Sequence, residues 1–66
     1  MNYYDIIKHL GDAGDKQVNI VAWNGNPAKV DIRRWYDGTP SFGVTLTDDE
    51  AEALYRILKE RYEGEG

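Results

Sequence analysis

An Asn24-Gly25 turn between two stretches of alternating sequence constrains this chain more than any other feature. Asn and Gly both tolerate a positive φ, and together they are the strongest short-range signal for a β-hairpin. Gln17–Trp23 alternates before the turn and Lys29–Tyr36 alternates after it. Pro27 cannot donate to a strand ladder, so it lengthens the turn. The sequence therefore predicts an antiparallel hairpin of two strands, over residues 17–23 and 29–36.

The flanking segments complete a small α+β domain. Asp37–Ser41 has the composition of a turn, and Phe42–Leu46 alternates as a short strand. Thr47 and Glu50 have the spacing of a capping box, which predicts that a helix follows. Tyr3–Leu10 fits either a helix or a strand, and we favour a strand because three short strands alone would leave the sheet too narrow. The prediction is one domain over residues 1–66, in which a four-stranded antiparallel sheet is followed by one C-terminal helix (strands about 3–10, 17–23, 29–36 and 42–46; helix about 48–62).

The two faces of the predicted hairpin differ in chemistry. Val30 and Ile32 point to one face, which we expect the helix to cover, since one helix covers only one face of a four-stranded sheet. The other face is expected to be exposed, and it carries Trp23, Lys29, Arg33 and Trp35. Flat aromatic rings interleaved with cations suit unpaired bases and the phosphates between them. Two alternatives stay open: both Trp side chains could be core residues, and Arg33 could pair with Asp31 or with a helix acid.

Charge is unevenly distributed along the chain. The whole sequence has a net charge of −4, yet residues 16–36 hold four cations against one acid and carry +3. Because the Debye length at physiological salt is about 8 Å, this local charge can attract an anion even in an acidic chain. The overall charge is still unfavourable for DNA binding. A module that uses the aromatic face to bind a protein partner is therefore the alternative function.

The sequence shows no pattern typical of catalysis or metal binding. There is no Cys, His9 is the only His, and capping explains the acids Asp48–Glu50. We therefore expect no enzyme activity, no catalytic residue, no metal and no cofactor. The absence of Cys, of a signal peptide and of a run of about 20 apolar residues leads us to expect a cytoplasmic protein that does not bind membranes.

Three segments in this order carry a resemblance to a known family: Trp23-Asn24, Pro27–Trp35 and Gly43–Thr47. Over about residues 16–60 the chain resembles the bacterial YdbC-type branch of the transcriptional positive cofactor four family. The resemblance implies a four-stranded antiparallel sheet, one helix, a homodimer packed through its helices, and single-stranded DNA lying across the exposed sheets with little sequence preference. The chain departs from the family in a shortened loop at Gly11–Lys16, and at three positions where better-known members are richer in Lys: Asn24, Asn26 and Phe42.

The resemblance also implies roles for particular residues. Trp23 resembles the hairpin aromatic that stacks a base, and Arg33 resembles the strand arginine that contacts phosphate. Trp35 and Tyr36 fall where the family keeps strand aromatics near the DNA, and Lys29 lies in the basic hairpin. The expected DNA-binding set is Lys16, Trp23, Asn24, Asn26, Lys29, Arg33, Trp35 and Tyr36. The expected dimer interface is Leu54, Ile57, Leu58 and Arg61.

These residues predict a coactivator-like protein of transcription or an accessory protein of replication or repair. The transcription machinery is a candidate protein partner. Melted duplex DNA and RNA are alternative ligands, because stacking on aromatic rings does not read the 2′-hydroxyl.

Overall fold

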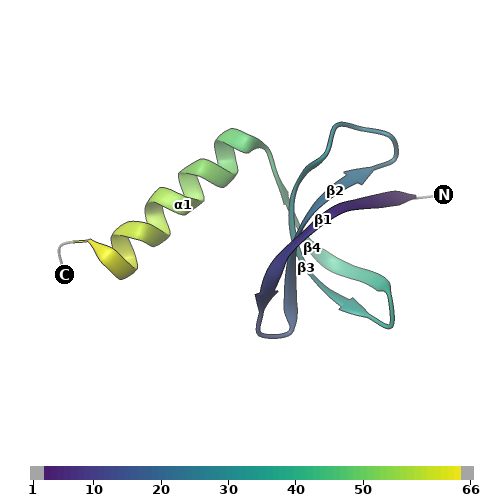
Figure 1. The fold of residues 1–66 in the computed structure, drawn as a ribbon, viewed down its shortest axis with the longest axis horizontal. Coiled ribbons are helices and arrows are strands. Elements are labelled where there is room, and N and C mark those ends of the chain that lie inside the picture. Colours follow the sequence, from purple (N-terminus) through teal and green to yellow (C-terminus); the bar gives the residue numbers. More distant parts are fainter. Residues whose placement is uncertain (1–2, 65–66) are drawn as a thin grey trace.

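The computed structural model describes residues 3–64 and contains one antiparallel sheet followed by one helix (Figure 1). The sheet is formed in chain order by β1 (Tyr4–Ala13), β2 (Lys16–Trp23), β3 (Lys29–Tyr36) and β4 (Thr39–Leu46), and α1 (Asp48–Glu63) follows. The predicted α+β class, with four antiparallel strands and a C-terminal helix, is confirmed. The outermost residues of the predicted domain, 1–2 and 65–66, lie outside the described residues.

Three strands, β1, β2 and β4, are longer than predicted because the turns beside them are shorter. The loop expected at Gly11–Lys16 is reduced to Gly14-Asp15, with Gly14 at a φ of 65°, so β1 continues to Ala13. The turn expected over Asp37–Ser41 is reduced to Asp37-Gly38, with φ values of 49° and 79°, so β4 begins at Thr39 rather than at Phe42. At Asp37-Gly38 both residues have positive φ, which matches the twist of an antiparallel hairpin, so a longer loop is not needed there.

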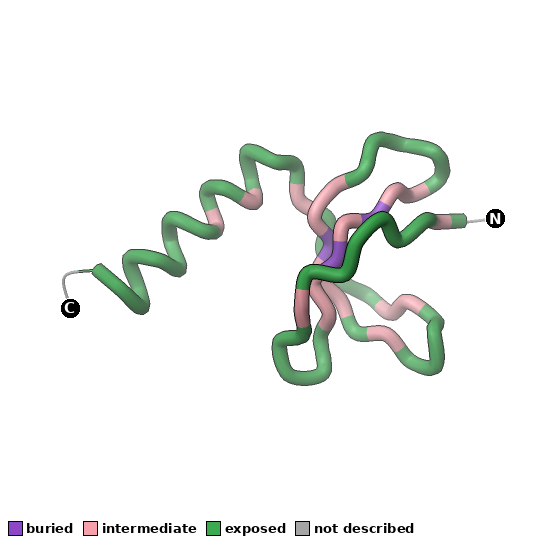
Figure 2. Tube along the Cα trace, in the orientation of Figure 1, coloured by how far each residue is buried: buried purple, intermediate pink, exposed green. Residues whose placement is uncertain are grey.

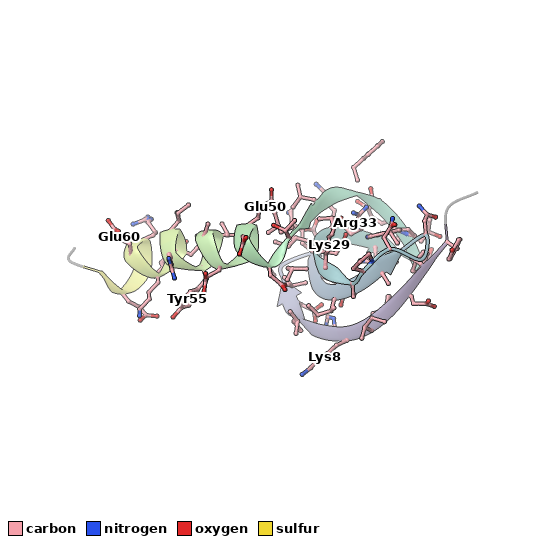
Figure 3. The ribbon with its side chains drawn as sticks, turned by 90° about the horizontal axis from the view of Figure 1, so that it is seen from above. Lys8, Lys29, Arg33, Glu50, Tyr55 and Glu60 are labelled. Atoms are coloured by element: carbon pink, nitrogen blue, oxygen red, sulfur yellow. The ribbon has the colours of Figure 1, made fainter. Side chains whose placement is uncertain are left out.

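Irregular register bends the sheet into a curl. Ile7 and Leu10 are extra residues in the pairing of β1 with β2, and a further irregularity lies between Arg33 and Trp35. Extra residues bend a strand and increase its twist. Figure 3 shows Lys29 and Arg33 inside the curl and Lys8 pointing outward from β1. Register then defines an inner face, with the odd-numbered residues of β2 and β3, and an outer face, with their even-numbered residues.

The buried residues lie on the inner face. Among the described residues only Asn19, Val21 and Asp31 are buried, and all three belong to this face (Figure 2). The outer face is apolar but only half buried, with Val18, Ile20, Val30 and Ile32. The face that was expected to be open is thus the one on which the small core forms.

The helix extends away from the sheet (Figure 1). A capping box fixes its start: the Glu50 N–H donates to Thr47 Oγ1 at 3.2 Å, and the Thr47 N–H donates to Glu50 Oε1 at 2.8 Å. Of the described elements α1 contacts only β3 and β4, and no residue from Asp48 to Glu63 is buried. The helix leaves both sheet faces uncovered (Figure 1), contrary to the expectation that it lies on one of them, and its few contacts are with β3 and β4. Within residues 3–64 there is no helix of sufficient length and apolar character to span a membrane.

Candidate nucleic-acid interface

Asp31 lies at the centre of the inner face. Its register partners are Asn19 on β2 and Thr45 on β4, and its side chain is completely buried. Arg33 donates twice to this carboxylate, from Nε to Oδ1 at 2.6 Å and from Nη2 to Oδ2 at 2.7 Å. Thr45 Oγ1 and Trp23 Nε1 also donate to Oδ2, at 3.0 and 3.1 Å. A buried carboxylate is tolerated only when it is paired and hydrogen-bonded, and these donors meet that requirement.

These bonds hold Arg33 in one orientation. Its Nη1 donates to the Ser41 carbonyl at 2.8 Å, and its guanidinium carbon lies 4.6 Å from the centre of the Trp23 ring. Only 14% of the Arg33 side chain is exposed. Gly43 makes room for it, because a Cβ at this position would overlap the Cβ of Arg33. Arg33 therefore pairs with Asp31, one of the alternatives that the sequence left open, and its charge is balanced before any ligand binds.

Both indoles belong to one aromatic cluster. Tyr4 on β1 lies between them, with its ring centre 5.3 Å from that of Trp23 and 5.4 Å from that of Trp35. The Tyr4 hydroxyl donates to the Gly38 carbonyl at 3.1 Å, which ties the cluster to the β3–β4 turn. Trp35 Nε1 is buried without a hydrogen-bond partner among the described residues. Each indole is half buried, so each combines a packing contact with an accessible portion.

The β2–β3 turn is exposed over Asn24–Ala28. Asn24 is engaged with the start of the chain, because its N–H donates to the Tyr3 carbonyl at 2.8 Å and its Oδ1 accepts from the Tyr3 N–H at 3.0 Å. The Asn26 N–H donates to the Trp23 carbonyl at 2.9 Å and closes the turn. Lys29, half buried, begins β3 on the inner face directly after this turn. Trp23, Asn26 and Lys29 thus lie at the same end of the hairpin.

Lys16 and Tyr36 lie at the other end of the hairpin and on the outer face. Arg34 connects them, since it is the register partner of Lys16 and its Nη1 donates to Tyr36 Oη at 3.0 Å. Asp15 lies 3.2 Å from Lys16 Nζ and 3.5 Å from Arg34 Nε. The hydrogen bond from Lys16 lowers the pKa of Asp15, and the bond to Tyr36 raises the pKa of Arg34. The predicted DNA-binding residues therefore form two separate groups.

Three residues of this region were absent from the predicted set. Asp31 has a sequence signal that could have identified it, because it occupies the same strand face as Arg33 and lies two residues away. Tyr4 is the register partner of Trp23, and its contact with Trp35, two strands away, depends on the curl, which no local pattern predicts. Phe42 is 98% exposed, whereas the sequence marked it only as a position without a Lys. An exposed aromatic ring of this kind is a further surface available for stacking.

The residues predicted for a dimer interface lie on α1. Ile57 and Leu58 are exposed, and Leu54 is half buried on the same helix. The guanidinium of Arg61, in the last turn, lies 5.4 Å from the centre of the Tyr62 ring. Among the described elements α1 contacts only β3 and β4, and no residue of this stripe is fully buried.

His9 is engaged with neighbouring side chains. Its Nδ1 lies 2.6 Å from Asn19 Oδ1, and its Nε2 lies 3.5 Å from Asp12 Oδ1. Within residues 3–64, no group of three or more His, Asp or Glu side chains is arranged to hold a metal ion.

Comparison with known proteins identifies the family. A family model described as Transcriptional Coactivator p15 (PC4) matches residues 10–57, which include β2, β3, β4 and most of α1. The chain belongs to this family. The resemblance drawn from the Trp23–Trp35 and Gly43–Thr47 segments is confirmed at the level of the PC4 family, and its bacterial YdbC-type branch stays a prediction. PC4 domains bind nucleic acid and are not enzymes.

A bacterial protein is also similar in sequence to this chain. An uncharacterized protein of Treponema pallidum (strain Nichols) is 38% identical over 50 residues, which are 73% of this chain and 59% of that protein. The chain therefore spans less than two thirds of the length of this relative.

Proposed function

We propose that this PC4 domain binds single-stranded DNA on the inner face of its sheet. It acts in the cytoplasm as a coactivator-like protein of transcription or as an accessory protein of replication or repair. The observation that carries the proposal is the placement of Trp23, Arg33 and Trp35 on one face beside Lys29, with a single buried carboxylate bonded to both Trp23 and Arg33. Single-strand binding requires aromatic rings that stack bases and cations that follow phosphates. Membership of the PC4 family supports the same ligand.

The residues of the inner face contribute to DNA binding in different ways. Trp23 and Trp35 offer partly exposed rings, and each stacked base contributes about 1–3 kcal/mol. Lys29 supplies the phosphate contact that depends most on salt, because Asp31 already balances the charge of Arg33. Asn24 and Asn26 line the turn at this end of the path.

Lys16 and Tyr36 extend the binding path beyond the inner face. Tyr36 is 55% exposed, so its ring is accessible to a base that follows the strand around the end of the hairpin. Lys16 lies beside Arg34 in the neighbouring strand, where the two cations face one nearby acid, Asp15.

The same proposal includes a homodimer. Val21 is the only fully buried apolar residue among those described, which is a small core for a chain of 66 residues. Leu54, Ile57 and Leu58 form the proposed interface on α1, with Arg61 at its rim. Two joined copies would present two inner faces to one strand and gain affinity through linkage.

Titration with an oligo-dT strand tests the proposed function. Trp fluorescence is followed at two salt concentrations, about 50 and about 200 mM. Quenching with an affinity that falls at higher salt is expected, because bases stack on the indoles and phosphates contact cations. Absence of any response would contradict DNA binding and favour a module that binds a protein partner. Competition by oligo-U and by duplex DNA then distinguishes the alternative nucleic-acid ligands.

A matched pair of lysine variants locates the DNA on the inner face. Lys29→Ala should remove one phosphate contact. The slope of log K for oligo-dT against log salt concentration should then become shallower by about 0.7. Lys8→Ala removes the same charge from the side chain that points outward from β1 (Figure 3), and it should leave the slope unchanged. Equal effects of the two variants would mean that the DNA does not follow the inner face.

A further inference from the structure

We propose that Asp31 is a positioning residue for single-stranded DNA, because it orients Trp23 and Arg33 before the strand arrives. This inference rests on the proposed DNA-binding function. Asp31 is completely buried, so it acts through these two side chains and not by touching the ligand.

The geometry of the carboxylate supports this role. Arg33 Nε donates to Oδ1 at 2.6 Å and Arg33 Nη2 donates to Oδ2 at 2.7 Å. These two bonds fix the plane of the guanidinium. Trp23 Nε1, from the neighbouring strand, donates to Oδ2 at 3.1 Å and fixes the edge of the indole. The guanidinium consequently lies over the Trp23 ring, 4.6 Å from its centre. One carboxylate thus sets the relative placement of a stacking ring and a cation on two different strands.

Such an arrangement has a benefit for binding. A long Arg side chain and a free indole lose rotamer freedom when they contact a ligand, and this loss opposes binding. On the inner face the freedom of Arg33 and Trp23 is already lost in the unbound protein, since their polar atoms are held by Asp31. The DNA then meets a surface whose geometry is formed in advance.

The charge of Asp31 makes the inference testable. A carboxylate close to a DNA path repels phosphate, so electrostatics alone predicts tighter binding when Asp31 is neutralised. A positioning role predicts weaker binding for the same change, because Trp23 and Arg33 lose a shared anchor. The two accounts differ in the sign of the effect.

The experiment compares two neutralised carboxylates. Asp31→Asn should bind oligo-dT about tenfold more weakly than the parent, as expected for the loss of hydrogen bonds to a charged group. Asp5→Asn removes the same charge from an exposed position on β1 and should leave the affinity within about twofold of the parent. The indole N–H resonance of Trp23 should shift in Asp31→Asn and stay in place in Asp5→Asn.

A second pair of variants applies if Asp31→Asn does not fold. Trp23→Phe keeps an aromatic ring but removes the donor to Asp31, whereas Trp35→Phe removes an N–H that has no partner in the described residues. Both variants lose a similar ring area, so a larger loss of affinity in Trp23→Phe supports the role of Asp31. Equal losses overturn it.

The outcomes distinguish the positioning role of Asp31 from the proposed DNA binding. If the parent does not bind oligo-dT, the proposed function is wrong and the inference is overturned with it. If the parent binds and a folded Asp31→Asn binds as tightly or more tightly, DNA binding stands and Asp31 has no positioning role.

Discussion

The two faces of the sheet bury different kinds of residue. The inner face carries Asn19, Asp31 and Val21 in full burial, and the two polar residues are hydrogen-bonded to neighbouring side chains. The outer face carries β-branched residues that are only half buried, and Val44 beside them is exposed. Burial in the single chain therefore follows the curl of the sheet and not the hydrophobicity of its faces. The inner face thus holds all the fully buried residues of the described chain, whereas the outer face and α1 hold none.

The largest expected effect comes from placing a charge on the uncovered helix. Leu58→Asp should dissociate the proposed homodimer, because an unpaired carboxylate in an apolar interface costs about 3 kcal/mol, a more than 100-fold rise in Kd. Sedimentation equilibrium measures this change. Arg56→Ala serves as the control, since it removes only an exposed pair with Glu52 at 3.5 Å. A Leu58→Asp protein that stays fully dimeric would place the interface elsewhere.

On the inner face, the largest effect should follow from removal of Arg33. Arg33→Ala leaves Asp31 buried without its cation and should lower the free energy of unfolding by about 3 kcal/mol, as for other broken buried pairs. Urea denaturation measures the loss. Arg34→Ala removes an exposed neighbouring Arg and should change stability little. Similar losses in the two variants would show that the Asp31–Arg33 pair is not a special feature of this face.

Local sequence signals predicted the elements but not their packing. The Asn24-Gly25 turn and the Thr47 capping box are encoded by adjacent residues, and both are present as predicted. The curl depends on extra residues at Ile7 and Leu10, whose effect appears only when β1 pairs with β2. Alternation placed Trp23 and Arg33 on one face correctly, yet it could not reveal that this face closes around Asp31.

The sequence pattern of the helix does not predict where the helix lies relative to the sheet. The sequence predicts that the helix covers one face of the sheet, and the family resemblance assigns Leu54, Ile57 and Leu58 to a dimer interface. An amphipathic stripe shows that a helix needs a partner, but it does not say which surface provides it. In the single chain, α1 touches only β3 and β4.

A smaller effect is expected at the start of α1. Thr47→Ala removes the side-chain half of the capping box and should lower the free energy of unfolding by about 1 kcal/mol. Circular dichroism during urea denaturation measures the change. Oligo-dT affinity per folded dimer should stay the same, since the cap is not part of the inner face. A loss of affinity without a loss of stability would connect α1 to DNA binding directly.

Selective observation of the two Trp side chains tests the central claim most directly. The chain contains two Trp residues, so uniform 15N labelling gives one indole N–H resonance each for Trp23 and Trp35 beside the backbone amides. On addition of oligo-dT both indole N–H signals should shift, while backbone amides of α1 away from the sheet keep their positions. Indole signals that stay unmoved while amides of α1 or of the outer face shift would contradict binding on the inner face.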